Sequence, residues 1–505
     1  TGLEVQRTFS GGVTVRTERD CFGREIRKSV RSGGIEQGAY RYQWGIANRL
    51  LSKENELTGT VTRYDYDRFD FLIRQETMQG SETDVIYRVP DFVGNLFETP
   101  DKKDRKYGAG GKLLEDPDCF YHYDDEGNLI FREFKQLQET GVRFDRKRME
   151  KERGIRCLAT GTGWLYEWSS NGMLKKVIRP DGRPVEFRYD ALGRRTAKQY
   201  FGTVTRWVWD GNVPIHEWSY KVTDMQPDEE ENTASKEPTE DITTWVFEAG
   251  TFVPTAKIQD GKQYSIVSDY LGTPIQMYDE QGDKTWDCTL DIYGKVLTFN
   301  GRSLNDCPFR FLGQYEDEET GLYYNRFRYY SSESGSFLSQ DPIKFEGKNP
   351  TLYGYVSDSN SFIDYYGLAI VDTEFIWISE NGEMTAAGTN PRDRVNRNTT
   401  GINEGLSAPN RHTSTMHAEI EAITTIKTQG ASGGTGVLIV KGKNICPYCK
   451  GDVKNLARQM DLDSLKIIDA DGTEYLFDKK GLNTIKNGGM SYKQAKQNAI
   501  NANKH

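Results

Sequence analysis

Apolar and polar residues alternate in short runs along most of the chain, and each run ends at turn-forming residues. Residues 164–168 (WLYEW) lead into Ser170-Asn171-Gly172, and residues 185–190 (VEFRYD) lead into Ala191-Leu192-Gly193. Alternation over about four to eight residues, closed by Gly, Asn or Asp, is typical of strands joined by hairpin turns. The pattern therefore predicts an all-β fold for residues 1–368.

One local pattern recurs within these runs: an aromatic residue, an acid, a glycine turn, then Leu and a basic residue. It is seen at Tyr123-Asp124, at Tyr189-Asp190 and twice in succession in residues 64–67 (YDYD). Recurrence at about 20 residues predicts a repeat array, since one hairpin alone cannot bury its apolar side. An ordinary large β-sandwich is the alternative. Residues 223–241 hold eight acids and no aromatic residue, which predicts a solvated loop between two strands.

The pattern changes near residue 368. Residues 1–368 hold 54 of the 60 aromatic residues, and their net charge is −11 against +2 for residues 369–505. This step indicates two separately built parts. In the second part, apolar runs and helical periodicity predict alternating strands and helices. We expect strands at 375–378, 436–440, 465–469 and 473–477, helices at 416–427 and 452–460, and a hairpin turn at 470–472.

Composition excludes several classes of protein. A net charge of −9 argues against general phosphate binding by the whole chain, and the aromatic content argues against disorder. A mean hydropathy of −0.72 without a long apolar run predicts no membrane span. Residues 1–4 (TGLE) lack an initiator Met and the features of a signal peptide, so we expect a fragment or a processed chain. Five of the seven cysteines stand alone, which predicts reduced thiols.

Residues 309–355 carry a long and specific signature. Residues 313–330 read GQYEDEETGLYYNRFRYY, and residues 349–355 read NPTLYGY. These residues resemble the core of Rhs/YD-repeat proteins, and the upstream repeats extend the resemblance over residues 1–368. The resemblance implies a mainly β fold, in which a large YD-repeat β shell, or cocoon, encloses a small α/β deaminase-like domain at residues 369–505. Such shells carry variable C-terminal toxins between bacteria by type VI secretion, or act within insecticidal toxin complexes.

The shell of this family ends in a self-cleaving motif of the form Asp-Pro-x-Gly-Leu. The matching residues here are 364–368 (DYYGL), with Tyr365 in place of Pro. The resemblance pairs Asp364 with the upstream Asp341 and places Arg328 beside them. Close carboxylates do not readily both ionise, so such a pair shares a proton. One can then activate a water as base while the other polarises the scissile carbonyl as acid.

The predicted cut lies between Leu368 and Ala369, where the composition changes. Without the resemblance, Asp341 and Asp364 would be interpreted as turn-capping residues, because Asp is common in turns.

Two chemical clusters fall in the second part. One is His417-Ala418-Glu419 at a predicted helix start, and the other is Cys446-Pro447-Tyr448-Cys449 after a predicted strand. One imidazole and two thiolates leave Zn²⁺ a fourth position for water, which is the open arrangement of a catalytic site. Bound zinc lowers the pKa of its water to about 7, and Glu419 is then the natural proton shuttle.

This combination resembles the zinc-dependent cytidine-deaminase superfamily over about residues 370–480. Pro447 stands between the cysteines and not before the first, which favours the more divergent toxin branches. The resemblance implies that His417, Cys446 and Cys449 bind zinc and that Glu419 is the general acid and base. The expected reaction is attack at C4 of cytosine, loss of ammonia and formation of uracil.

Three other interpretations of the second part stay open. Cys446 and Cys449 could form a glutaredoxin-like redox pair, although residues 450–505 lack the later proline of that fold. The zinc could be structural, with His412 as the nearest fourth ligand. His417 and Glu419 could also be plain surface residues.

The sequence therefore predicts an interbacterial toxin: an autoproteolytic shell that releases a zinc-dependent cytosine deaminase acting on nucleic acid, with DNA favoured over RNA. The alternatives are a non-enzymatic delivery shell with a structural-zinc tail, and a thiol-redox effector. The expected partners are a nucleic acid substrate, an immunity protein, a secretion apparatus and a chaperone. We expect the chain to be made in the bacterial cytoplasm and secreted, with the toxin domain acting in the target-cell cytoplasm.

Overall fold

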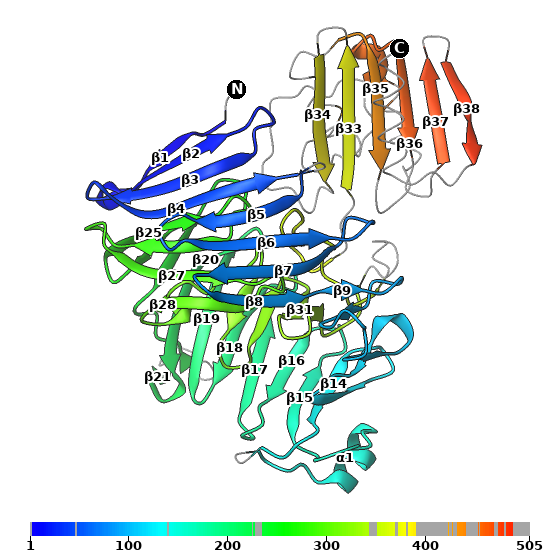
Figure 1. The fold of residues 1–505 in the computed structure, drawn as a ribbon. Coiled ribbons are helices and arrows are strands. Elements are labelled where there is room, and N and C mark those ends of the chain that lie inside the picture. Colours follow the sequence, from blue (N-terminus) through cyan, green and yellow to red (C-terminus); the bar gives the residue numbers. More distant parts are fainter. Residues whose placement is uncertain are drawn as a thin grey trace. The chain divides into compact units, whose positions relative to one another are not determined.

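The computed structural model describes most of the first 368 residues and parts of the remainder (Figure 1). The described residues are 3–45, 48–138, 141–224, 226–227, 235–342, 351–368, 372–379, 382–389, 423, 427, 432–440, 453, 455–468, 473–478 and 481–487. The chain divides into two compact units. The first comprises residues 1–248, 252–342 and 350–367, and the second comprises residues 249–251, 343–349 and 368–505.

The first unit is built from antiparallel sheets in which each strand pairs with the next along the chain, as expected for an array of hairpins. An eight-stranded sheet, blue in Figure 1, contains β1 (Gln6–Thr8), β2 (Thr14–Arg19), β3 (Glu25–Ser32), β4 (Ile35–Trp44), β5 (Leu50–Asn55), β6 (Thr60–Tyr66), β7 (Leu72–Gln79) and β8 (Glu82–Tyr87). The strands β9 (Val89–Pro90) and β10 (Leu96–Phe97) form a separate pair.

A sixteen-stranded sheet follows. Its strands are β11 (Lys106–Tyr107), β12 (Leu113–Glu115), β13 (Cys119–Tyr123), β14 (Leu129–Phe134), β15 (Gly163–Trp168), β16 (Leu174–Ile178), β17 (Pro184–Tyr189), β18 (Arg195–Tyr200), β19 (Thr203–Asp210), β20 (Val213–Lys221), β23 (Thr243–Phe247), β24 (Pro254–Gln259), β25 (Lys262–Ser268), β26 (Pro274–Tyr278), β27 (Lys284–Leu290) and β28 (Val296–Gly301). The helix α1 (Arg146–Arg153) lies between β14 and β15. Short 3-10 helices are η1 (Ser10–Gly12), η3 (Ala109–Gly111), η4 (Val222–Asp224) and η5 (Leu304–Asp306).

The predicted loop at 223–241 lies between the paired strands β20 and β23, as expected. It contains two very short strands that the sequence did not indicate, β21 (Gln226–Pro227) and β22 (Ser235–Lys236).

The recurring acid of the sequence pattern closes the turn between two strands. At Asp190, one carboxylate oxygen accepts hydrogen bonds from the main-chain N–H groups of Leu192 (2.9 Å) and Arg194 (2.8 Å). Gly193 has φ +74°, a conformation that Gly adopts without a steric penalty. The basic residue of the pattern is used as well, since Arg194 Nε donates to the second Asp190 oxygen at 2.7 Å. The acid, the glycine and the base therefore form one structural unit.

The recurring aromatic residue links each hairpin to the one before it. The Tyr189 hydroxyl donates to the Leu174 carbonyl at 2.7 Å, and the Tyr66 hydroxyl donates to the Leu50 carbonyl at 2.9 Å. The same bond is made by indole N–H groups, for example from Trp168 to the Leu129 carbonyl at 2.8 Å. Each ring is packed against the array while its polar tip finds a main-chain partner, as buried Tyr and Trp require. These bonds explain why the pattern repeats about every two strands.

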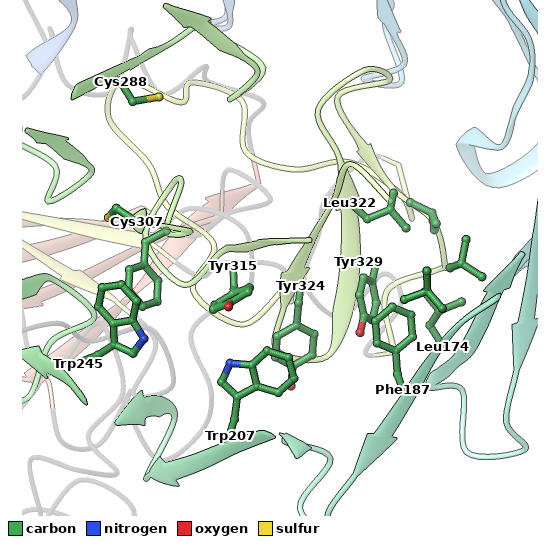
Figure 2. Close-up of a cluster of buried hydrophobic side chains, with 14 of the residues drawn as sticks. Leu174, Phe187, Trp207, Trp245, Cys288, Cys307, Tyr315, Leu322, Tyr324 and Tyr329 are labelled. Atoms are coloured by element: carbon green, nitrogen blue, oxygen red, sulfur yellow. The ribbon is translucent and has the colours of Figure 1, made fainter. Parts of the chain in front are cut away.

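Residues 309–342 and 351–367 of the first unit, called the covering segment, pack on the sixteen-stranded sheet. Their regular part is a four-stranded sheet of β29 (Tyr315–Asp317), β30 (Leu322–Asn325), β31 (Arg328–Ser331) and β32 (Ser336–Phe337). Figure 2 shows Tyr315, Tyr324 and Tyr329 of this segment facing Trp207 and Phe187 of the large sheet. One apolar cluster therefore holds the two sheets together. Its members are Leu129, Tyr166, Leu174, Val177, Val185, Phe187, Trp207, Trp245, Ile266, Met277, Trp286, Cys288, Cys307, Phe309, Tyr315, Leu322, Tyr324, Tyr329 and Leu338.

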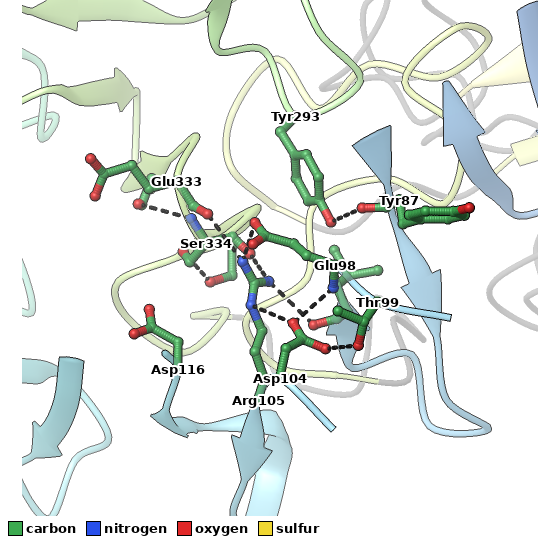
Figure 3. A network of polar contacts seen from close by, with 12 residues as sticks. Tyr87, Glu98, Thr99, Asp104, Arg105, Asp116, Tyr293, Glu333 and Ser334 are labelled. Carbon is green, nitrogen blue, oxygen red and sulfur yellow. Dashed lines mark hydrogen bonds and ion pairs between the residues drawn. The ribbon is translucent and has the colours of Figure 1, made fainter. Parts of the chain in front are cut away.

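Buried arginines also hold the covering segment. Arg105 donates to the main-chain carbonyls of Ser334 (2.9 Å) and Glu333 (3.1 Å) and pairs with Glu98 at 2.6 Å (Figure 3). Arg195 pairs with Asp317, and both side chains are buried. A buried guanidinium is stable only where acceptors surround it, so these contacts fix where the segment lies.

The second unit contains a six-stranded sheet in the order β34-β33-β35-β36-β37-β38. The strands are β33 (Asp372–Ser379), β34 (Gly382–Thr389), β35 (Thr435–Val440), β36 (Ser464–Ile468), β37 (Thr473–Asp478) and β38 (Gly481–Asn487). The four strands expected from the sequence are present as β33, β35, β36 and β37. The described residues Ile423, Lys427, Val453 and 455–459 are helical, in agreement with both predicted helices.

The pairing of these strands is mixed: β35 and β36 run parallel, while β36 and β37 run antiparallel as predicted for the hairpin. The strand β34, the edge strand beside β33, was not predicted. Leu438, Val453, Leu456, Leu465 and Ile467 are buried and form part of the apolar interior of this unit.

The five cysteines of the first unit are free thiols. Burial raises the pKa of Cys119 and Cys307 to about 12 and that of Cys288 to about 11, which keeps these thiols protonated and unreactive at neutral pH. Among the described residues, no helix is long and apolar enough to cross a membrane.

Glu133 on β14 is a buried acid that we expect to stabilise the first unit. Its fully buried carboxylate accepts from the N–H groups of Leu158, Ala159 and Gly161 and lies 3.2 Å from the His122 ring. Burial alone would raise the pKa of Glu133, but these hydrogen bonds outweigh it and lower the pKa to about 2.

We therefore expect Glu133 to stabilise the first unit fully above about pH 4.5, and to lose this contribution of about 3 kcal/mol as the pH falls towards about 2. Glu133→Gln should lower the unfolding free energy at pH 7 and flatten its dependence between these pH values. Urea unfolding at several pH values measures both effects. An unchanged acid limb in the variant would contradict this role.

Candidate functional site

The candidate site begins at a tight hairpin. Asn325 ends β30 and Arg328 begins β31, and the two residues pair directly across the strands. Arg326 in the two-residue turn has φ +59°, as turns of this length require at one or both central positions. Cross-strand partners project to the same face of a sheet, so the hairpin delivers an amide and a guanidinium to one place.

Arg328 brings together the two acids predicted from the sequence. Its Nη2 lies 3.0 Å from Asp341 Oδ2 and 3.6 Å from Asp364 Oδ2. Arg328 is 2% exposed, and Asp341 and Asp364 are 3% exposed each. The three residues lie far apart in the sequence but share one buried charge cluster.

The environment of Arg328 is dry and crowded. Burial lowers the pKa of the Arg328 guanidinium below its usual value, and the carboxylates of Asp341 and Asp364 offset part of this effect. Its Nη1 donates to the Leu352 carbonyl at 3.2 Å, and the guanidinium carbon lies 3.7 Å from the centre of the Phe337 ring. Removal of water strengthens every charge interaction in such a cluster.

The segment 364–367 is held by its main chain. Arg328 Nε donates to the Gly367 carbonyl, and Asn325 Nδ2 donates to the Asp364 carbonyl at 2.9 Å. The main-chain N–H of Tyr366 donates to Asp364 Oδ1 at 3.3 Å. Gly367 has φ +64°, and a Cβ at this position would lie 2.7 Å from the Asn325 carbonyl oxygen. Gly is therefore required at position 367 both by the backbone conformation and by the space available.

Tyr365, which stands where the resemblance predicts proline, is held by packing. Its ring stacks on Phe252 with centroids 5.0 Å apart. Its main chain approaches Gly313 so closely that a Cβ on Gly313 would lie 2.5 Å from the Tyr365 carbonyl oxygen. Packing against Phe252 and Gly313 thus fixes a turn that proline would otherwise stiffen.

The remaining predicted site residues fall elsewhere. Leu368 is buried, and Ala369 lies outside the described residues. His417, Glu419, Cys446 and Cys449 also lie outside them, so their predicted roles remain predictions. Within the described part of the chain, no group of three or more His, Cys, Asp or Glu side chains is arranged to hold a metal ion.

Asn325 and the Leu352 carbonyl were not among the predicted site residues. The sequence did not point to Asn325, because Arg326 and Phe327 are not residues that two-residue hairpin turns favour at their centre. No local signal identifies the Leu352 carbonyl, since its contact depends on how a distant loop packs.

Two family models match separate parts of the chain. Residues 12–355 match the family described as "Teneurin YD-shell". Residues 379–487 match the family described as "Putative cytidine deaminase, C-terminal domain".

Curated relatives and solved structures were also found. "Double-stranded DNA deaminase toxin A" of Burkholderia cenocepacia (strain H111) is 29% identical over 72% of this chain and 25% of that protein. "Toxin protein Tse5" of Pseudomonas aeruginosa is 25% identical over 68% of this chain and 30% of that protein. The chain thus spans about a quarter of the length of the curated relatives it matches. A crystal structure of TcdB2-TccC3 without its hypervariable C-terminal region aligns over 72% of this chain and 21% of that chain, with 19% identity and a TM-score of 0.34.

Gly367 can be tested against a matched glycine. We expect Gly367→Ala to reduce the unfolding free energy of the first unit by about 1–3 kcal/mol more than Gly321→Ala. Gly321 has a similar φ of +67°, but no atom lies within 4 Å of an added Cβ there. Chemical denaturation of the two variants measures the difference, and equal losses would show that the close approach to Asn325 is unimportant.

Proposed function

Because the chain belongs to the teneurin YD-shell family and carries a cytidine-deaminase family domain behind the shell, we propose that it is an interbacterial toxin that cuts itself between Leu368 and Ala369. The released C-terminal part is proposed to be a zinc-dependent deaminase of cytosine in nucleic acid. The observation that supports self-cleavage is that Arg328, Asp341 and Asp364 lie together in one buried cluster. The match of residues 379–487 supports the deaminase.

The geometry of the carboxylates supports an aspartyl mechanism. Both acids approach the same Arg328 nitrogen, so one guanidinium sets their separation and screens their repulsion. One Asp, as the carboxylate, takes a proton from the attacking water, and the other, as the protonated acid, donates a hydrogen bond to the Leu368 carbonyl oxygen. A bond forms between the water oxygen and the Leu368 carbonyl carbon, and the bond to the Ala369 nitrogen breaks. The proton ends on the new amino terminus, which leaves a carboxylate at Leu368.

Arg328 would serve this reaction by orienting both acids and the main chain before the cut. It holds the Gly367 carbonyl, one peptide before the proposed cut, while it also contacts both acids. A fixed main chain next to the scissile bond lowers the entropic part of the barrier.

The donor set in the second part fits a catalytic zinc site, with His417, Cys446 and Cys449 as proposed ligands. Zinc supplies Lewis acidity that activates water at neutral pH. Glu419 is proposed to carry the proton from the water to the ammonia that leaves C4 of cytosine. The relative named as a double-stranded DNA deaminase toxin supports DNA over RNA as the substrate.

We propose that the β sheets form a shell around the C-terminal domain, which keeps the enzyme harmless until release. The chain would be made in a bacterial cytoplasm, with a chaperone, and exported by a secretion apparatus to act in the cytoplasm of a target cell. A producing cell would need an immunity protein for the released domain.

Self-cleavage between Leu368 and Ala369 should give two fragments. Intact mass spectrometry of the purified chain should show a fragment that starts at Ala369. Asp341→Asn and Asp364→Asn should each slow the cut by at least about 100-fold, because each removes a proton-transfer group. Asp358→Asn is the matched control, since Asp358 is equally buried in the same segment and caps a turn at Asn360. Unchanged cleavage in Asp364→Asn would exclude the aspartyl mechanism.

Deamination is tested on the self-cleaved full chain with cytosine-containing DNA and RNA, single- and double-stranded, with uracil as the readout. Glu419→Ala should abolish uracil formation and retain zinc, whereas Cys446→Ser should lose both. Glu421→Ala, two residues further along, is the control and should stay active. Bound zinc without activity in the unaltered chain would favour structural zinc, and a redox couple without zinc would favour a thiol effector.

A further inference from the structure

Asn325 occupies a position in the site that its packing alone does not explain. It is completely buried at the end of β30, directly opposite Arg328. Both side chains approach the same four-residue segment, 364–367, and each bonds to a main-chain carbonyl of it. Arg328 holds the carbonyl at the end of the segment, and Asn325 holds the one at its beginning. The two residues therefore hold the segment from both ends.

Within the described part of the chain, only one end of the Asn325 amide forms a hydrogen bond. Its Nδ2 donates to the Asp364 carbonyl at 2.9 Å, but no donor among the described residues bonds to its Oδ1. A buried acceptor without a partner costs about 1–3 kcal/mol, while a single amide hydrogen bond contributes about 1 kcal/mol. The net contribution of the Asn325 side chain to stability is therefore small, which favours a role beyond stability.

This inference rests on the proposed self-cleavage: we propose that Asn325 is a positioning residue for the cut. By fixing the Asp364 main chain, the Asn325 amide holds the Asp364 carboxylate in reach of Arg328 and Asp341. Asn325 takes no part in the proton transfers. The bond made to Leu368 and the bond broken to Ala369 are those of the proposed mechanism.

The chemistry of the side chain explains why an amide stands here. Leu has nearly the same size but cannot donate, so it would leave the Asp364 carbonyl without this partner. A charged Asp also lacks the donor and adds a third carboxylate beside Asp341 and Asp364. A protonated Asp, in contrast, has an O–H that can donate to the Asp364 carbonyl.

The test uses the full chain made by cell-free translation with a radioactive label. After a short pulse, synthesis is stopped and the chain is diluted into buffers from about pH 5 to about pH 8. The loss of the full-length band on a gel gives the cleavage rate of the unaltered chain and of Asn325→Leu, Asn325→Asp and Tyr324→Phe. Tyr324 is the matched control because it is the neighbouring buried residue, and its hydroxyl bonds to Gly193 and Arg195 instead. Protease resistance of the shell, measured in parallel, reports folding.

We expect Asn325→Leu to cleave about 10–100-fold more slowly at every pH, with the shell still resistant to protease. Relative to the unaltered chain, Asn325→Asp should be slow at pH 8 and recover towards pH 5, where the introduced acid regains a proton to donate. Tyr324→Phe should stay within about twofold.

The outcomes separate the two proposals. If the unaltered chain does not cleave, the proposed self-cleavage is wrong and the role of Asn325 fails with it. If the unaltered chain cleaves and both Asn325 variants match its rate, self-cleavage stands and the positioning role is wrong. A deficit in Asn325→Asp that does not change with pH would also overturn that role, because a merely structural defect gives no recovery on protonation.

Discussion

Buried guanidinium groups must find acceptors, and this requirement organises the first unit. Arg88 donates to the carbonyls of Val356 and Ser357, Arg105 to those of Glu333 and Ser334, and Arg328 to those of Leu352 and Gly367. All these acceptors are main-chain groups of the covering segment, residues 309–342 and 351–367. A buried charge that lost its partners would cost several kcal/mol, so each arginine admits only one path for the segment. The path of the segment in turn determines where its end, and thus the candidate site, is located.

The repeated turns build the array on which the covering segment packs. A closing acid can satisfy two main-chain N–H groups, and the aromatic residue before it can bond to the carbonyl of the preceding hairpin, as at Asp190 and Tyr189. The result is an array in which long-range order is built from local bonds, which suits a sheet of many strands with few crossovers. The covering segment then buries the rings of Trp207 and Phe187 that the array leaves on one face.

The candidate site joins stability and chemistry in the same contacts. The contacts of Asn325 and Arg328 are made to residues 364–367, all of which precede the proposed cut. The proposed hydrolysis after Leu368 would therefore remove none of them, and the first unit would keep its charge pairs. Gly367 also packs tightly against the Asn325 carbonyl, and this one close approach both shapes the turn and fixes the neighbouring peptide.

The sequence alone determined the features that depend on neighbouring residues. The alternation of polar and apolar positions predicted the strands, the Tyr-Asp pattern predicted the repeat, and the change near residue 368 marked a second part with its own α/β pattern. The resemblance to Rhs proteins named Arg328, Asp341 and Asp364, but spacing could not show that they meet. Only the tertiary structure decided that one guanidinium contacts both acids, that Asn325 bonds to the Asp364 carbonyl, and that Tyr365 stacks on Phe252. The physical reason is that the turns are fixed by bonds within about five residues, whereas the site depends on a buried charge whose partners lie on distant segments.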